Sequence, residues 1–451
     1  MADTQPLNVR EATEADYNAV SRSIEMKLDI YFNGLNSEPF VVTRDNYLID
    51  VDLLEETCAD ADNPFGTVSS NEVSFSLYNN EGLLSPTNPD SPYYGKIQSG
   101  VPIKVYIRPA SETEEIEWQP MGEFYVSDWM TSVTGIVANI TANDELLSIF
   151  GKPHVKIPVL KNVTMRELYE AFFKALGIEA AIDEKLTEKL VYGYNVQENK
   201  NFLTDLSIGA QSYVFCDRNG KPKVDYARGP QEVMHTLTDS DQIIDIMSKQ
   251  SILTDYTGIE VITNKPQESE VTSVLSLTEL NVPSGNHTSS ATSLSQTPLY
   301  RLVSAMLTGT SNVRVTDVVA TCLDIVYSTT NPSDKEVLAA LNILGTFIET
   351  VAVSHVEGSD KILKVDNMYI QTDEYTEKFL RLLRAYVTNK VPVLELKIRG
   401  NPAYLPGEKI RVVSERYNVD FTGVLVRQHF KYSGNLSSTI RLFNSEVMEV
   451  L

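Results

Sequence analysis

The chain has 451 residues, of which 42% are hydrophobic and 22% are charged, a composition typical of a folded chain with room for two to four domains. Its formal net charge of −23 at pH 7 disfavours ordinary nucleic-acid binding, because an acidic surface repels phosphate groups. The N-terminus lacks a basic region followed by an apolar run, and polar residues interrupt the most apolar stretch, 337–353, so we expect neither a secretory signal nor a membrane segment.

Residues 1–22 are polar and without sustained periodicity, which predicts an N-terminal arm. From Ile24 to Phe32 apolar and polar residues alternate, and Asn33-Gly34 follows as a turn signal, a pattern typical of a strand leading into a hairpin. Further alternating segments occupy 47–54, 71–78, 101–108, 122–132 and 135–144. Short strands with turn signals and almost no helix between them predict a small antiparallel β-barrel over 23–147.

A long passage rich in Pro, Asn, Ser and Gly joins two of these strands between residues 79 and 100. Unlike a disordered linker, it keeps several large apolar or aromatic residues, namely Leu83, Leu84, Tyr93, Tyr94 and Ile97. We therefore expect an ordered loop. Long ordered loops are uncommon and usually contact a ligand, a lid or a neighbouring subunit, so these five residues are the candidate subunit or partner contacts.

The period changes beyond residue 147. Apolar residues of 162–177 follow a helical spacing, with Thr164 and Glu167 as a capping box and Gly177 as a stop. A second helix is expected at 201–211, followed by strand, Asn219-Gly220 turn and strand over 212–227. Residues 148–247 are therefore predicted to form an α+β module.

Residues 248–390 are predicted to contain both strands and helices and to belong to the second β-rich half of the chain. A strand is expected at 257–263, and the Ser/Thr-rich passage 265–300 has the composition of an exposed, mobile loop. Ser333 and Glu336 resemble a capping box for a helix at 334–344, and an apolar stripe predicts another helix at 373–389, with strands between these helices.

The last segment, 391–451, returns to strand patterns that predict the closing strands of a second β-barrel. The predicted fold class is therefore mainly β with α+β insertions, in which two small antiparallel β-barrels flank an α+β module. Three cysteines, Cys58, Cys216 and Cys322, lie far apart and suit a reducing compartment as small core residues.

No motif demands catalysis. The five histidines are isolated, and 60–72 fails as a calcium loop because Pro64, Phe65 and Asn71 occupy positions that need other residues. No phosphate-binding or nucleophile motif is present, and the acidic run before Trp118 is better explained as a solvated hairpin tip than as a glycosidase pair. We expect no enzyme activity, cofactor or metal.

Three stretches resemble phage tail hub proteins, which form the central ring of a baseplate or tail tip. They are 63–107 with its "SPYYGKI" run, the helical passage 151–177, and 394–442 with "PGEKIRV", in which Glu408 replaces the usual Asp. Residues 265–360 match nothing in that family. The family also includes members with an appended lysozyme or peptidase domain, which we do not expect in a chain that ends at Leu451.

The resemblance implies a homotrimeric ring in the virion, at the tail tip or baseplate, made after synthesis in the host cytoplasm. It implies contacts with the tail tube protein and with a central spike or fibre protein, with the tape measure protein as a further candidate, and genomic DNA passing through only in transit. An acidic lumen suits such a conduit. Two alternatives stay open: a peripheral baseplate or tail adaptor, and a carbohydrate-binding protein or hydrolase that stacks sugars on Trp118 and Trp129.

Overall fold

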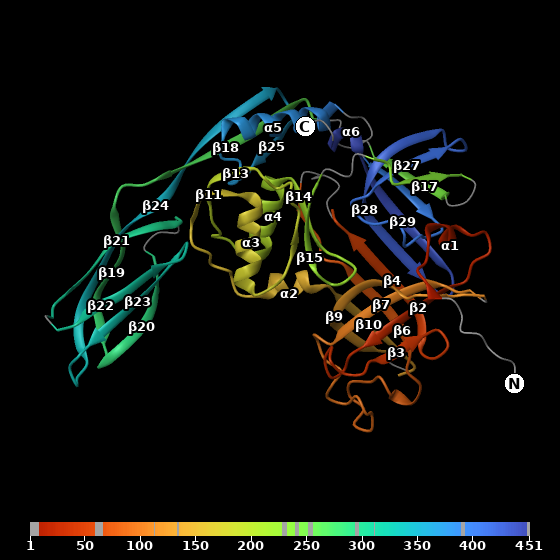
Figure 1. Cartoon of the computed structure of the whole chain (residues 1–451), viewed down its shortest axis with the longest axis horizontal. Coiled ribbons are helices and arrows are strands. Elements are labelled where there is room, and N and C mark those ends of the chain that lie inside the picture. Colours follow the sequence, from red (N-terminus) through yellow and green to blue (C-terminus); the bar gives the residue numbers. More distant parts are fainter. Residues whose placement is uncertain are drawn as a thin grey trace. The chain divides into compact units, whose positions relative to one another are not determined.

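The structure is a computed structural model that describes residues 9–58, 66–111, 113–132, 135–227, 232–239, 243–250, 256–293, 297–310, 312–388 and 393–448. The chain forms two compact units (Figure 1). The first unit comprises Met1–Gly151, Gln211–Tyr256 and Arg381–Leu451, and the second comprises Lys152–Ala210 and Thr257–Leu380. The five-part division that the sequence predicts stays a prediction, whereas the mainly β fold with α+β insertions is confirmed.

The strands expected between residues 24 and 144 all form, and they belong to one large sheet of the first unit. Their order is β4-β6-β10-β9-β7-β2-β3, with antiparallel pairing throughout. Alternate residues of β6, Val73, Phe75 and Leu77, point into a common apolar core. The bounds are β2 (Ile24–Ile30), β3 (Phe40–Thr43), β4 (Leu48–Glu56), β6 (Glu72–Tyr78), β7 (Pro102–Pro109), β9 (Gln119–Thr131) and β10 (Val137–Asn143).

The predicted closing strands continue the same sheet instead of forming a separate one. Strand β28 (Val419–Tyr432) pairs with β27 over Val419–Val424 and with β4 over Arg427–Tyr432. It contributes Leu425 to a second core and Phe430 to the first. The sequence pattern did not predict that β28 joins the two parts of the sheet. The other strands here are β16 (His235–Thr238), β17 (Ile243–Gln250), β26 (Val393–Ile398), β27 (Lys409–Ser414) and β29 (Leu436–Asn444).

The described part of the predicted N-terminal arm packs onto the first unit. Strand β1 (Val9–Arg10) pairs in parallel with β8 (Glu115–Ile116). Helix α1 (Glu14–Asn18) begins with a capping box of Thr13 and Asp16. The side chain of Tyr17 is buried, and its hydroxyl donates to Oε1 of Gln119 at 2.9 Å. Residues 1–8 lie outside the described part of the chain.

Short elements complete the first unit. The hairpin predicted around Asn219-Gly220 is confirmed as β14 (Ser212–Cys216) and β15 (Pro222–Tyr226), and β14 also pairs with β5 (Thr67–Val68). Two short helices, α2 (Glu145–Gly151) and α6 (Ser445–Met448), and a 3₁₀ turn, η1 (Asn80–Gly82), belong here too. All three cysteines of the chain are buried, as predicted.

The two helices predicted in the second unit are confirmed. Helix α3 (Met165–Leu176) has the expected capping box of Thr164 and Glu167, and Gly177 closes it with φ of 69°. Helix α4 (Asn199–Ala210) lies beside α3 (Figure 1), and the Phe172 and Phe202 rings meet at 4.8 Å. The neighbouring strands are β11 (Leu160–Thr164), β12 (Ala181–Ile182) and β13 (Lys189–Gly193).

Six further strands of the second unit form a β-sandwich, where the prediction of a mobile loop over 265–300 was wrong, and β18 pairs with the C-terminal half of β24 and with β25. One layer is β19-β24-β21 and the other is β20-β23-β22, with an apolar core between them. Thr is a good strand former, so a Ser/Thr-rich passage forms an exposed strand once a neighbouring strand provides backbone hydrogen-bond partners. The bounds are β18 (Gly258–Glu268), β19 (Thr272–Val282), β20 (Gly285–Thr292), β21 (Leu299–Thr308), β22 (Arg314–Ala320), β23 (Asp324–Asn331), β24 (Val337–Gly358) and β25 (Ile362–Asp366).

The helix predicted at 334–344 was also wrong, because those residues begin the long strand β24. Ala339, Leu341 and Ile343 are buried at every second position, which places them on the inner face of the sandwich. The Ser333 hydroxyl bonds Oδ1 of Asn331 and the Lys335 carbonyl, and so forms a turn and not a helix cap. Tertiary pairing therefore overrode the helical propensity of Leu and Ala. The last predicted helix is confirmed as α5 (Asp373–Thr388).

Candidate functional site

The 79–100 loop is ordered, as the sequence predicts, because it folds as a ladder of turns. Backbone N–H groups donate to carbonyls three residues earlier, from Asn79 as far as Tyr94. The Asn79 side chain reinforces the first turn, since its Oδ1 accepts from the N–H of Leu84 at 2.6 Å and its Nδ2 donates to the Ser85 hydroxyl at 2.9 Å. Ser91 Oγ donates to the Leu83 carbonyl at 2.5 Å and draws the two ends of the ladder together.

The five predicted contact residues divide between interior and surface. Leu84 is fully buried and Ile97 is 9% exposed, so both pack within the first unit. Leu83 and Tyr93 are partly buried against the same core. Tyr94 is 55% exposed. A role of this loop in subunit contact stays a prediction, and Tyr94 is the one of the five that offers a large free surface.

An aromatic cluster holds the loop against the sheet. The Tyr93 ring stacks on Phe32 with centroids 4.3 Å apart and meets Phe40 at 5.2 Å. Burial raises the pKa of the Tyr93 hydroxyl above its ordinary value. The indole N–H of Trp129 donates to the Leu84 carbonyl at 2.9 Å, so this tryptophan anchors the loop.

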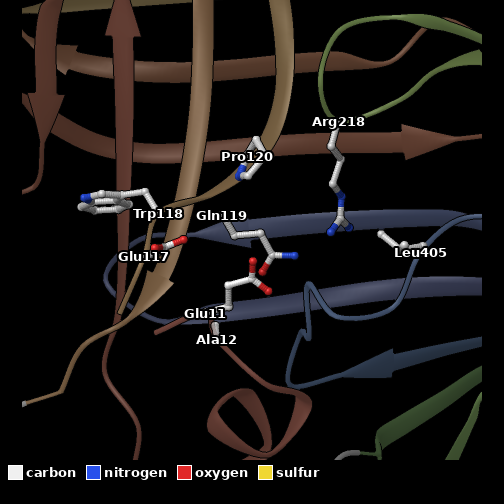
Figure 2. A pocket seen from close by; sticks show the side chains of 8 residues that line it. All are labelled: Glu11, Ala12, Glu117, Trp118, Gln119, Pro120, Arg218 and Leu405. Carbon is white, nitrogen blue, oxygen red and sulfur yellow. The ribbon is translucent and has the colours of Figure 1, made fainter. Parts of the chain in front are cut away.

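A second candidate site is a pocket of about 310 Å³ in the first unit, which we call the Trp118 pocket (Figure 2). Four chain segments meet there: the N-terminal segment, the start of β9, the β14–β15 turn and the loop before β27. In Figure 2 the carboxylate of Glu11 lies beside the amide of Gln119, and that of Glu117 lies near Trp118. The lining residues are Glu11, Ala12, Glu117, Trp118, Gln119, Pro120, Arg218 and Leu405.

The pairing of β1 with β8 places Glu11 and Glu117 at neighbouring backbone positions. Arg10 is opposite Ile116, and the N–H of Glu117 donates to the Arg10 carbonyl at 2.9 Å, so Glu11 and Glu117 follow at neighbouring positions. Gln119 is fixed from both ends of its amide. Its Oε1 accepts from Tyr17, and its Nε2 donates to the Pro402 carbonyl at 3.4 Å.

The guanidinium of Arg218 is engaged by a carboxylate that does not line the pocket. Its Nε and Nη2 donate to the two carboxylate oxygens of Glu55 at 2.6 and 2.7 Å, and the side chains of this pair are only 11% and 5% exposed. The same guanidinium donates to the carbonyls of Pro402 and Tyr404. Arg218 thus ties the β14–β15 turn to β4 and to the loop that carries Leu405.

A histidine joins three segments near this pocket, an arrangement we call the His235 clamp. Nδ1 of His235 lies 2.9 Å from Oε2 of Glu14, and Nε2 lies 3.2 Å from Oε2 of Glu408. The Tyr404 ring packs beside the imidazole, 4.7 Å between centroids. The hydrogen bond to Glu408, with that to Glu14, raises the pKa of His235 above its ordinary value against the opposing effect of burial. Only the imidazolium has an N–H for each carboxylate.

Within the residues that the structure describes, no group of three or more His, Cys, Asp and Glu side chains is arranged to hold a metal ion. In the same part of the chain, no helix combines the length and the apolar character needed to cross a membrane.

Sequence reasoning singled out Trp118 but missed the pocket around it. Glu11, Arg218 and Leu405 come from distant parts of the chain, and no local pattern links them. It noted Glu408 and treated the five histidines as isolated, so it did not bring His235 and Glu408 together. The parallel pairing of β1 with β8 and of β16 with β27 brings these segments close, and such non-local pairing leaves no periodic signal.

No protein-family model matches the sequence, and the comparison with curated proteins finds no relative. Solved structures do match. The 43 kDa tail protein of prophage MuSo2 from Shewanella oneidensis aligns over 94% of this chain and 100% of its own, with a TM-score of 0.54 and 11% identity. A tail protein from Neisseria meningitidis aligns over 94% and 98%, with a TM-score of 0.51 and 10% identity. The resemblance to phage tail proteins is therefore confirmed at the level of the fold.

Proposed function

We propose that the chain is a structural protein of a phage tail, of the type that forms the central hub of a tail tip or baseplate. One observation carries this proposal: the fold matches two tail proteins over 94% of this chain and over nearly all of theirs. A match of that extent includes the sheet, the helical insertion and the sandwich together, and not one common motif. Since a fold can host many functions, the role in the tail remains our inference from it.

In its finer form the proposal is a homotrimeric ring that joins the tail tube to a spike or fibre and lets DNA pass during ejection. The formal charge of −23 supports the conduit, because a negative wall does not retain phosphates. The exposed Tyr94 on the 79–100 loop supports a contact with a neighbouring subunit or with the tube, since tyrosine is enriched in protein interfaces. The role is mechanical, and we assign no catalytic step.

The alternatives are weaker. A peripheral adaptor would share the fold and differ in symmetry. A carbohydrate-binding protein would need a stacking platform, yet the indole N–H of Trp129 is committed to the Leu84 carbonyl and its ring packs on Phe32 at 5.9 Å. A screen of the purified protein against a glycan array tests that alternative directly.

The experiment that tests the hub proposal is the solution mass of the full-length protein by light scattering. A trimer has a mass of about 151 kDa, three times the 50.3 kDa of one chain. Electron microscopy of the protein mixed with tail tubes then asks whether a threefold ring caps the tube end. A monomer that leaves tube ends bare would overturn the proposal, and a ring of another symmetry would favour the adaptor.

A further inference from the structure

The Trp118 pocket is lined by two exposed acidic residues, Glu11 and Glu117. Three arginines near it are each paired with a carboxylate outside its lining: Arg10 with Asp16 and Glu114, Arg108 with Glu25, and Arg218 with Glu55. Within the part of the chain that the structure describes, no hydrogen bond or ion pair engages the carboxylate of Glu11 or of Glu117. Two acidic side chains at neighbouring positions on paired strands repel each other, so a cation between them would stabilise the pair.

We propose that the Trp118 pocket binds the guanidinium group of an arginine side chain from a partner protein. The carboxylates of Glu11 and Glu117 would receive its N–H groups, and the apolar surfaces of Trp118, Pro120 and Leu405 would pack against its methylene stem. The volume of about 310 Å³ is at the lower limit for ligand pockets, which suits one side chain better than a large cofactor.

The chemistry of the walls distinguishes arginine from other cations. A planar guanidinium presents several N–H donors in a fixed fork that two adjacent carboxylates can share, whereas the lysine ammonium is a compact and strongly hydrated charge. Trp118 already packs against one guanidinium of its own chain, with the Arg108 carbon 4.3 Å from the ring centroid. A metal ion would find only two carboxylates here, fewer ligands than a protein site usually provides.

The pocket is complete within one chain, so this inference does not rest on the proposed function. If the protein does assemble in a tail, the arginine would belong to a neighbouring subunit or tube protein. Contacts of that kind set specificity between partners more than total affinity. A single side chain presented as a small molecule will bind weakly, in about the millimolar range.

The test is a fluorescence titration that uses Trp118 as the only indole. The chain has two tryptophans, so Trp129→Phe isolates the signal of the pocket. The probes are N-acetyl-arginine amide, N-acetyl-lysine amide and the neutral analogue N-acetyl-citrulline amide. We expect a saturable change with the arginine probe, weaker binding of the lysine probe, and no saturable change with citrulline at the same concentrations.

Substitutions then locate the binding. Glu11→Gln combined with Glu117→Gln should weaken the arginine probe at least about tenfold, because two charge-assisted hydrogen bonds are lost. Glu115→Gln is the matched control, since Glu115 is exposed on β8 next to the pocket but does not line it. Thermal unfolding shows whether each variant is folded. The proposal is overturned if the arginine probe gives no saturable change, if citrulline binds equally well, or if the double variant binds like the control.

Discussion

Arg218 and Glu55 form a bidentate ion pair that is almost excluded from solvent. The pair joins a hairpin turn to the middle of the large sheet. Both hydrogen bonds are short, at 2.6 and 2.7 Å, and the remaining donors of Arg218 reach backbone carbonyls. A buried pair of this kind is costly to break, because the surviving partner keeps its charge in an environment without water.

Removing one member should therefore destabilise the first unit strongly. We expect Arg218→Met or Glu55→Gln to lower the free energy of unfolding by about 3–5 kcal/mol, measured by chemical denaturation followed by circular dichroism. The matched control is Arg411→Met. Arg411 pairs with Asp420 at 2.8 and 3.0 Å on side chains 48% and 60% exposed, and we expect a much smaller loss because water screens an exposed pair. Equal losses in both variants would contradict this assignment.

The 79–100 loop offers a pair of substitutions that separate stability from assembly. Leu84→Ala should lower the free energy of unfolding by about 2–5 kcal/mol, because it leaves a cavity in the core. Tyr94→Ala should change it by less than about 0.5 kcal/mol, since that ring is exposed. If the loop joins subunits, Tyr94→Ala will shift the mass measured by light scattering toward monomer. An unchanged mass would remove Tyr94 from the interface.

The His235 clamp should make stability depend on pH. The folded pKa of His235 is raised, so the clamp stabilises the fold fully below the unfolded pKa of about 6.5, and this stabilisation is lost as pH rises through the folded value. The groups facing the imidazole are Glu14, Glu408 and Tyr404. We expect the difference in thermal midpoint between the native protein and His235→Gln to be largest near pH 6 and to shrink as pH rises above that folded pKa.

His287→Gln serves as the control for that experiment. His287 is exposed on β20 in the second unit and bonds only a backbone carbonyl among the described residues. Its substitution should give a difference in midpoint near pH 6 that is much smaller than that of His235→Gln, because the one hydrogen bond that is lost is exposed. If His235→Gln behaves in the same way, the clamp has no part in the stability of the first unit.

The capping box of α3 should contribute a smaller and local stabilisation. Thr164 Oγ1 accepts from the N–H of Glu167 at 3.1 Å, and the Glu167 carboxylate accepts from the N–H of Thr164 at 2.7 Å. We expect Thr164→Ala to cost about 1 kcal/mol and Thr164→Ser to cost much less, because serine keeps the hydroxyl. Hydrogen exchange of the first turn of α3 measures the difference. Equal exchange in the two variants would argue against the cap.

The elements that the sequence predicts well are those with a local cause. Thr164, Glu167 and Gly177 bound α3 as expected, and the period-2 alternation of β6 identifies its buried face. Prediction failed at 337–345, where Leu and Ala favour helix locally but are inserted between two strands of the sandwich. A single sequence does not show which distant strands will pair with a segment, and such pairing made 337–345 a strand.

The candidate sites follow the same division. That the 79–100 loop is ordered could be predicted from its own residues, because Asn, Ser and Gly favour turns and the apolar side chain of Leu84 favours burial. The Trp118 pocket and the His235 clamp could not be predicted, because each joins residues hundreds of positions apart. In the sequence the charged residues of both sites look like ordinary surface residues. Only the parallel pairing of β1 with β8 and of β16 with β27 brings them together.

Strand β28 has a consequence for how the protein responds to load. Its first half completes one core and its second half another, so the two parts of the sheet share a continuous peptide backbone at the Leu425–Arg427 irregularity. A force that separates those parts along the strand direction must shear the whole ladder to β4 at once, instead of opening it bond by bond. The first unit therefore should yield as one cooperative body, and the amides around Phe430 should exchange with solvent only when the entire unit opens.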